Sequence, residues 1–148
     1  DLSLKKTNGE ANICVFNNGG LRDIIAKGNV TIRDIYKVMP FENELVILEL
    51  NRDEYYHLLK YITKRGGEPI AGTKIIEKKD TILSQYNNYK KIKVLTSDYL
   101  ANGGDKMAFF KDSVSHTRTG LKIRDILLLE CEKIDTIQTT IDNRFTYD

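Results

Sequence analysis

The sequence is poor in the residues that build most catalytic and metal centres. It has two cysteines and two histidines, and His57 and His116 do not stand at a spacing typical of metal ligands. We find no Cys/His cluster, no pair of carboxylates with a nearby base and no serine nucleophile motif. These absences predict that the chain holds no catalytic residues and no metal ligands.

Long apolar runs and a strong charge are also missing. The longest apolar run, "ILLLEC" at 126–131, is far shorter than the roughly 20 residues of a membrane-spanning helix, so we expect no membrane span. The net charge is only +2, and the lysines are spread along the chain. This weak asymmetry is not the electrostatic footprint of a DNA- or RNA-binding domain, and we expect no nucleic-acid polymer as a partner.

The two cysteines, Cys14 and Cys131, leave two alternatives open. They could form a disulfide in an oxidising compartment. Two buried free thiols are the favoured interpretation, because they lie far apart in the sequence and an unpaired cysteine behaves as a small apolar side chain.

The length predicts a single domain over residues 1–148. A chain of this size buries about 68–70% of the surface that its unfolded form exposes, so it needs no disulfide or metal for stability. Its composition, 41% hydrophobic and 30% charged, is typical of soluble globular proteins. The chain opens on Asp1 without a signal peptide, which we interpret as an excised piece or a mature product.

Apolar patterning predicts several strands. "ANICVF" at 11–16 and "KKIKVLTSD" at 90–98 are rich in β-branched residues, and "ELVILELN" at 44–51 is apolar on both faces, as in an interior strand. Weaker candidates, for a hairpin or two edge strands and for a last short strand, are 72–79, 80–86 and 143–148.

Three segments predict helices, at 31–39, 51–67 and 121–134. Thr31 with Asp34, and Asn51 with Glu54, have the spacing of capping boxes, and Pro40 and Gly66 follow as stop signals. The side chains expected to face the core are Tyr55, Leu58, Leu59 and Ile62 in the second helix, and Ile123, Ile126, Leu127, Cys131 and Ile134 in the third. The mixed order of elements predicts an α+β fold, with a mixed sheet packed on helices.

Two of the loops carry residue types that bind ligands. The NNGG loop, "FNNGGLRD" at 16–23, has a glycine pair whose amides can form an anion nest, and Arg22 offers a fork that suits phosphate or carboxylate. The Phe41 turn, "MPFENE" at 39–44, holds an aromatic ring in a stiff turn. Alone, the first is also a plain turn with a surface arginine, and the ring either plugs the core or projects as a stacking platform.

The Tyr99 loop, "SDYLANGGDKMAFF" at 97–110, places Tyr99 and Asp105 on either side of a glycine pair. A core tyrosine and a helix-capping aspartate are the plainer alternative. The three loops together favour binding, because two rings can sandwich a base, with stacking worth about 1–3 kcal/mol per base. An acid can accept hydrogen bonds from ribose hydroxyls, and an arginine with amides stabilises negative charge. The combination predicts a nucleotide site.

Four motifs, "NNGGLR", "VMPFENELVILEL", "TSDYLANGGDKM" and "IRDILLLEC", occur in an order that resembles the C-terminal domain of the 5'-nucleotidase family. That family includes bacterial UDP-sugar hydrolases and ecto-5'-nucleotidase, and the resemblance runs from about Ile13 to Phe145. It implies a 5'-nucleotidase C-terminal domain-like fold that holds the nucleoside part of the substrate. Hydrolysis would need an N-terminal metallophosphatase domain with two divalent metal ions, which the 148 residues lack.

The resemblance also implies the site residues. Phe41 and Tyr99 would be the two stacking rings, and Asp105 would accept hydrogen bonds from the ribose. The base edge and the polar or anionic groups of the substrate would be contacted by Asn17 and Arg22, with Gly20 allowing close backbone approach. The chain departs from the family pattern in Tyr99, where phenylalanine is commoner, in Lys106, where glycine is usual, and in a missing helix before the first strand.

The function expected from this resemblance is substrate binding in a 5'-nucleotidase-like phosphoester hydrolase. The ligand would be a nucleoside, a nucleotide or a UDP-sugar, and the metallophosphatase domain would act in cis or in trans. These 148 residues alone would not be catalytic, and the location would be periplasmic or extracellular. The alternative is a non-enzymatic ligand-binding or docking module that retains the fold.

Overall fold

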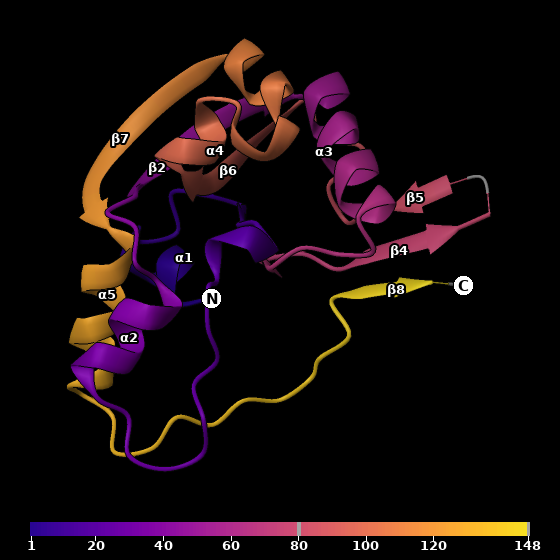
Figure 1. The fold of residues 1–148 in the computed structure, drawn as a ribbon. Helices are drawn as coiled ribbons and strands as arrows, with labels where there is room; N and C mark the ends of the chain where they lie inside the picture. The colour runs from indigo at the N-terminus through magenta and orange to yellow at the C-terminus, as the bar shows by residue number, and fades with distance from the viewer. Residues whose placement is uncertain (80, 148) are drawn as a thin grey trace.

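The computed structural model describes residues 1–79 and 81–147, and within them the strands form two sheets (Figure 1). The strands are β1 Ile13–Val15, β2 Glu44–Asn51, β3 Ile70–Ala71, β4 Ile75–Lys78, β5 Thr81–Leu83, β6 Lys91–Ser97, β7 Ser115–Lys122 and β8 Phe145–Tyr147. The helices are α1 Leu2–Lys6, α2 Ile32–Val38, α3 Arg52–Lys64, α4 Asp98–Ala101 and α5 Ile123–Cys131, with 3-10 helices η1 Asn18–Gly20, η2 Gly104–Lys106 and η3 Ala108–Asp112.

Both sheets mix parallel and antiparallel pairs. The larger sheet has the order β3-β1-β6-β2-β7; β1 and β6 run parallel and the other neighbours antiparallel. In the smaller sheet, of order β5-β4-β8, β4 pairs antiparallel with β5 and parallel with β8. This arrangement, with helices packed on the strands, confirms the predicted α+β fold.

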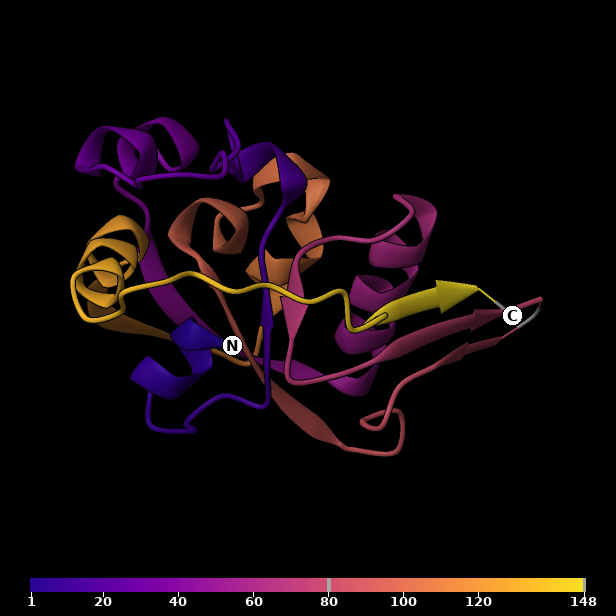
Figure 2. The same cartoon turned by 90° about the horizontal axis from the view of Figure 1, so that it is seen from below.

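Strand β2 carries the hydrophobic core to both faces of the larger sheet. Because successive side chains of a strand point to opposite faces, Val46 and Leu48 pack in one buried cluster with Leu58 of α3. Leu45 and Ile47 pack in a second cluster with residues of α5. In Figure 2, α3 and α5 flank the strands from opposite sides. Burial on both faces confirms that 44–51 is an interior strand, lying between β6 and β7.

Local sequence signals predicted the two helices before and after β2 well. Both capping boxes are present: Thr31 and Asp34 bond reciprocally at the start of α2, and Asn51 and Glu54 do so at the start of α3. Gly66, at φ +72°, follows the last turn of α3 in the left-handed conformation that glycine accepts readily. The predicted core face of α3 is buried, with Tyr55, Leu58, Leu59 and Ile62 at most 1% exposed.

The remaining predicted strands also form, with shifted ends. Segments 11–16 and 90–98 contain β1 and β6. The candidates at 72–79 and 80–86 form a hairpin of β4 and β5, and the tail supplies β8. Asp80 and Asp148, at the ends of two predicted segments, lie outside the described residues.

Several elements escaped prediction, among them β7 and α1. The strand β7 has no alternating apolar pattern, because it lies at the edge of the sheet with most of its side chains exposed. The short helix α1 precedes β1, where the resemblance implied that a helix is missing. That expectation was therefore wrong.

The third predicted helix is shorter than expected. The predicted segment 121–134 begins inside β7, and α5 runs only from Ile123 to Cys131. Ile123 and Ile126 are buried and Leu127 is half-buried, as predicted. Ile134 is 40% exposed and lies beyond the helix, so its assignment to the core face was wrong.

The structure keeps both cysteines as free thiols, which confirms the favoured interpretation. The expectation that both are buried was wrong, because Cys131 is only half-buried.

Burial raises the pKa of the Cys14 thiol to about 12. Since the thiolate is the reactive form, we expect iodoacetamide at pH 8 to modify Cys131 while Cys14 stays unreacted. Peptide mass spectrometry measures this, and both thiols should react in denaturant. Equal rates for Cys14 and Cys131 in the native protein would contradict the prediction.

Candidate functional site

All six residues predicted for the site line one pocket of about 270 Å³. The lining consists of Asn17, Gly20, Arg22, Phe41, Tyr99 and Asp105, together with Gly19 and Asn43. The predicted residues come from three loops that are far apart in the sequence. The structure therefore brings the NNGG loop, the Phe41 turn and the Tyr99 loop to one place.

The strand directions explain why the three loops meet. Because β1 and β6 run parallel, the NNGG loop after β1 and the Tyr99 loop after β6 leave the sheet at the same end of the strands. Strand β2 is antiparallel to β6, with Leu45 opposite Ser97, so the Phe41 turn enters β2 at that end too. The pocket thus lies where β1 and β6 end and β2 begins.

Neither aromatic ring of the pocket belongs to the core. Phe41 is 42% exposed and Tyr99 is 48% exposed, so the alternative that Phe41 plugs the core and Tyr99 is a core tyrosine is wrong. The guanidinium carbon of Arg22 lies 6.0 Å from the centre of the Phe41 ring, and its Nη1 donates to the carbonyl of Gly19 at 3.1 Å. Arg22 therefore links the NNGG loop to the Phe41 ring at the pocket wall.

The acid of the pocket is held by residues from two loops. The amide Nδ2 of Asn17, a buried side chain, donates to Oδ2 of Asp105. The backbone N–H of Asp105 donates to the hydroxyl of Tyr99 at 3.3 Å, and that hydroxyl donates to Oδ1 at 3.5 Å. The ring and the carboxylate therefore meet at the same wall, as the motif predicted.

Glycines make these close contacts possible. Gly103 has φ +87°, a conformation that side chains other than glycine rarely adopt. A Cβ on Gly104 would lie 2.5 Å from Cε1 and Cζ of Tyr99, so the ring packs directly against this backbone. A Cβ on Gly20 would lie 2.8 Å from Oδ1 of Asn17. Gly20 thus allows close approach of the Asn17 side chain.

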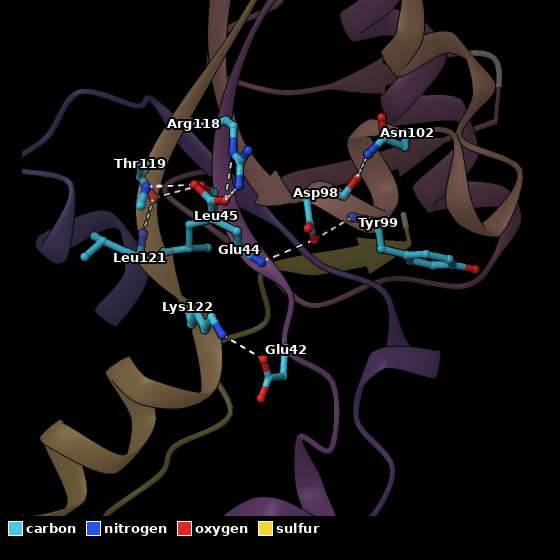
Figure 3. Close-up of polar contacts among 11 residues, drawn as sticks. Glu42, Glu44, Leu45, Asp98, Tyr99, Asn102, Arg118, Thr119, Leu121 and Lys122 are labelled. Carbon is cyan, nitrogen blue, oxygen red and sulfur yellow. Dashed lines mark hydrogen bonds and ion pairs between the residues drawn. The ribbon is translucent and has the colours of Figure 1, made fainter.

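Asp98 ties the Tyr99 loop to the start of β2 (Figure 3). Its Oδ1 accepts from the backbone N–H of Tyr99 at 2.8 Å and from that of Glu44 at 3.2 Å. Glu44 in turn accepts from Arg118 Nε at 2.9 Å and from the N–H of Gly120 at 2.8 Å on the edge strand β7. These bonds, that of Arg118 foremost, hold the pKa of Glu44 below its usual range.

Arg124, on α5, holds the Phe41 turn in place. Its buried guanidinium donates to the carbonyl of Pro40 and to Oε1 of Glu42, each at 2.9 Å, and lies 4.3 Å from the centre of the Tyr36 ring. The two hydrogen bonds bracket Phe41 on both sides in the sequence. The sequence shows an arginine beside the apolar face of a predicted helix. It does not show which residues that arginine contacts, because these depend on the tertiary fold.

Two lining residues were not among the predicted site residues. Gly19 and Asn43 belong to the NNGG loop and the Phe41 turn, so membership of these motifs was the signal that could have identified them. The carbonyl of Asn43 accepts from the N–H of Ile123 at 3.0 Å, which fixes the turn against α5.

Lys106 adopts a backbone conformation that favours glycine, at φ +66°. The resemblance placed glycine at this position. We expect Lys106→Gly to raise the free energy of unfolding by up to about 1 kcal/mol, because the left-handed conformation costs side chains about 1–2 kcal/mol and glycine adds some unfolded-state entropy. Urea denaturation measures the change, and Lys106→Ala, which keeps a Cβ, should not reproduce it. A destabilised Lys106→Gly variant would refute the strain argument.

The pocket does not have the donors of a metal site. It contains one carboxylate, Asp105, which is already bonded by Asn17. Within residues 1–79 and 81–147, no group of three or more His, Cys, Asp or Glu side chains is placed to hold a metal ion. In the same part of the chain, no helix has the length and apolar character needed to cross a membrane.

Comparisons with known proteins identify relatives. The profile of the family described as "5'-nucleotidase, C-terminal domain" matches residues 3–71. The chain is similar to a 5'-nucleotidase of Vibrio cholerae, at 34% identity over 61 residues that cover 41% of this chain and 10% of that protein. It is also similar to an apyrase of Tabanus yao, at 23% identity over 145 residues that cover 77% of this chain and 26% of that protein.

A solved structure shares the fold over nearly the whole chain. The 5'-nucleotidase precursor of Thermus thermophilus matches with a TM-score of 0.85 and 20% identity, covering 99% of this chain and 34% of that one. The chain thus spans about a third of this structure, and about a quarter or less of the two curated relatives. The family profile matches residues 3–71 and the fold is shared over nearly the whole chain, so the chain is similar to the C-terminal domain of the 5'-nucleotidase family.

Proposed function

We propose that this domain binds the nucleoside part of a nucleotide or UDP-sugar, as the substrate-binding part of a 5'-nucleotidase-like phosphoester hydrolase. The observation that carries the proposal is the pocket itself. Two half-exposed rings, one carboxylate and one arginine line a single cavity. Because both rings line the same cavity, one ligand can contact both of them, and a concave site with a few convergent polar groups suits a small molecule.

Each group has a role in this proposal. The base stacks against Phe41 and Tyr99, because every base has a flat apolar face. The ribose hydroxyls donate to Asp105, whose carboxylate accepts charge-assisted hydrogen bonds. Arg22 stabilises the negative charge of a phosphate or a sugar diphosphate. The N–H groups of Gly20 and Leu21 already donate to carbonyls of their own loop and take no part.

The bond-breaking step belongs to another domain in this proposal. The pocket lining contains no nucleophile with a neighbouring base. A metallophosphatase domain, in cis or in trans, would supply the divalent metal ions, and residues 1–148 alone would hold the substrate without cleaving it. The names of the relatives, a 5'-nucleotidase and an apyrase, support hydrolysis of nucleotides as the reaction. A periplasmic or extracellular location goes with this assignment.

An NMR titration of the ¹⁵N-labelled chain tests the proposal. We expect adenosine, AMP and a UDP-sugar to shift the amides of Gly19, Gly20, Tyr99 and Asp105, with residues near the smaller sheet unchanged. Ribose 5-phosphate is the control without a base, and it should shift these signals much less. If none of the three ligands perturbs the pocket loops at millimolar concentration, the proposed function is wrong.

A further inference from the structure

Behind the pocket, side chains from the end of α3 and the loop after it connect two of the pocket loops. We propose that Tyr61, Arg65 and Glu68 are positioning residues that hold Asn17 and Asp105 in the mutual geometry that the ligand needs. The ligand in this inference rests on the proposed function, whereas the positioning rests on contacts within the chain.

Tyr61 holds the Asp105 wall. Its hydroxyl donates to the backbone carbonyl of Asp105 at 2.8 Å, although the two residues are on different elements. Burial raises the pKa of the Tyr61 hydroxyl above its usual range. The ring packs against Phe109 of η3, with centroids 6.1 Å apart, which restricts its rotation. Asp105 has φ +49°, which is a strained conformation for a residue other than glycine. The hydrogen bond from Tyr61 is made to the carbonyl of this same residue.

Glu68 holds the other wall. Its side chain is fully buried, and its Oε2 accepts from the backbone N–H of Asn18 at 2.6 Å. The side-chain amide of Asn18 returns a bond to the carbonyl of Gly67 at 3.1 Å. One residue after Glu68, the carbonyl of Pro69 accepts from the N–H of Phe16 at 2.9 Å. Hydrogen bonds therefore attach the NNGG loop to the segment that follows α3.

Arg65 joins the two anchors. Its Nε donates to Oε1 of Glu68, and its guanidinium carbon lies 5.5 Å from the centre of the Tyr61 ring. Since the Asn17 side chain donates directly to Asp105, the contacts close into a ring. The ring runs from the NNGG loop through Glu68, Arg65 and Tyr61 to Asp105, and back through Asn17.

A closed ring of contacts fixes a distance that neither loop fixes alone. A binding site gains affinity when its groups are held in the bound geometry before the ligand arrives. Loss of the Tyr61 bond should therefore free Asp105 to move relative to Asn17, without removing any group that touches the ligand. A role in stability alone would lower the unfolding temperature and leave the Asn17–Asp105 contact as it is.

Tyr61→Phe tests the inference with the smallest change, because it removes one hydroxyl and keeps the ring. Tyr56→Phe is the matched control, since Tyr56 lies on the same helix with an exposed ring and lines a different cavity. The first measurement needs no ligand: it follows the chemical shift and hydrogen exchange of the Asn17 side-chain amide by NMR. We expect exchange to quicken about 3- to 10-fold in Tyr61→Phe, the loss typical of one hydrogen bond, and to stay unchanged in Tyr56→Phe.

The second measurement is the dissociation constant for AMP, which we expect to rise about 3- to 10-fold in Tyr61→Phe. Glu68→Gln should shift the same Asn17 signals from the other side of the ring. If Tyr61→Phe lowers only the unfolding temperature and leaves the Asn17 amide unchanged, the positioning role is wrong. If the wild-type chain binds no AMP, the proposed function fails, and the Asn17 signals alone then decide whether the walls are positioned by Tyr61.

Discussion

Phe41→Ala and Tyr99→Ala should each weaken the binding of AMP by about fivefold or more and leave the fold intact. Stacking on one ring is worth about 1–3 kcal/mol per base, which corresponds to a factor of roughly 5 to 150 in affinity. Both rings are nearly half exposed, so their removal costs the core little. Titration calorimetry measures the affinity, and urea denaturation measures the free energy of unfolding.

Two further variants separate stacking from other losses. Tyr99→Phe keeps the ring and removes the hydroxyl that bonds Asp105, so we expect a loss of only about threefold. Tyr89→Ala removes a tyrosine that is 51% exposed and does not line the pocket, and it should bind AMP as the wild type does. Unchanged affinity in both pocket alanine variants would contradict the stacking role, as would a loss of affinity explained by unfolding.

The sequence predicts the parts of this fold that local rules control. The capping boxes at Thr31 and Asn51 and the core face of α3 depend on neighbours within a few residues, and they form as predicted. Strand β7 could not be predicted in this way. It is exposed at the edge of the sheet, and its place depends on pairing with β2 rather than on an apolar pattern.

For the candidate site too, the sequence predicted the residues in recognisable motifs but not the residues that hold these motifs in place. The residues that line the pocket stand in motifs with chemical character, such as glycine pairs, aromatic rings and an acid, and their assignment to the site came from the resemblance of these motifs to the 5'-nucleotidase family. Asp98, Arg124 and Tyr61, which hold those motifs in place, have partners between 44 and 84 residues away in the sequence. Single-sequence reasoning has no signal for such pairs, since only the tertiary fold brings them together.

Gly104→Ala should reduce AMP affinity at least as much as Tyr99→Ala does, although the glycine carries no group that can bind. Its new Cβ would lie 2.5 Å from two atoms of the Tyr99 ring and 2.7 Å from a third, so the ring must leave its place. Gly104 does not have a positive φ, so alanine fits its backbone and the fold should lose little stability. Displacement of the ring also breaks the bond between its hydroxyl and the N–H of Asp105.

The double variant Gly104→Ala/Tyr99→Ala tests this explanation directly. If Gly104 acts by giving room to the ring, its substitution has no further effect once the ring is gone, and the double variant should bind AMP as Tyr99→Ala does. Contacting residues are expected to show such non-additivity, whereas independent sites add their effects. Losses that add in the double variant would mean that Gly104 acts on the ligand or on the backbone of Asp105 rather than through Tyr99.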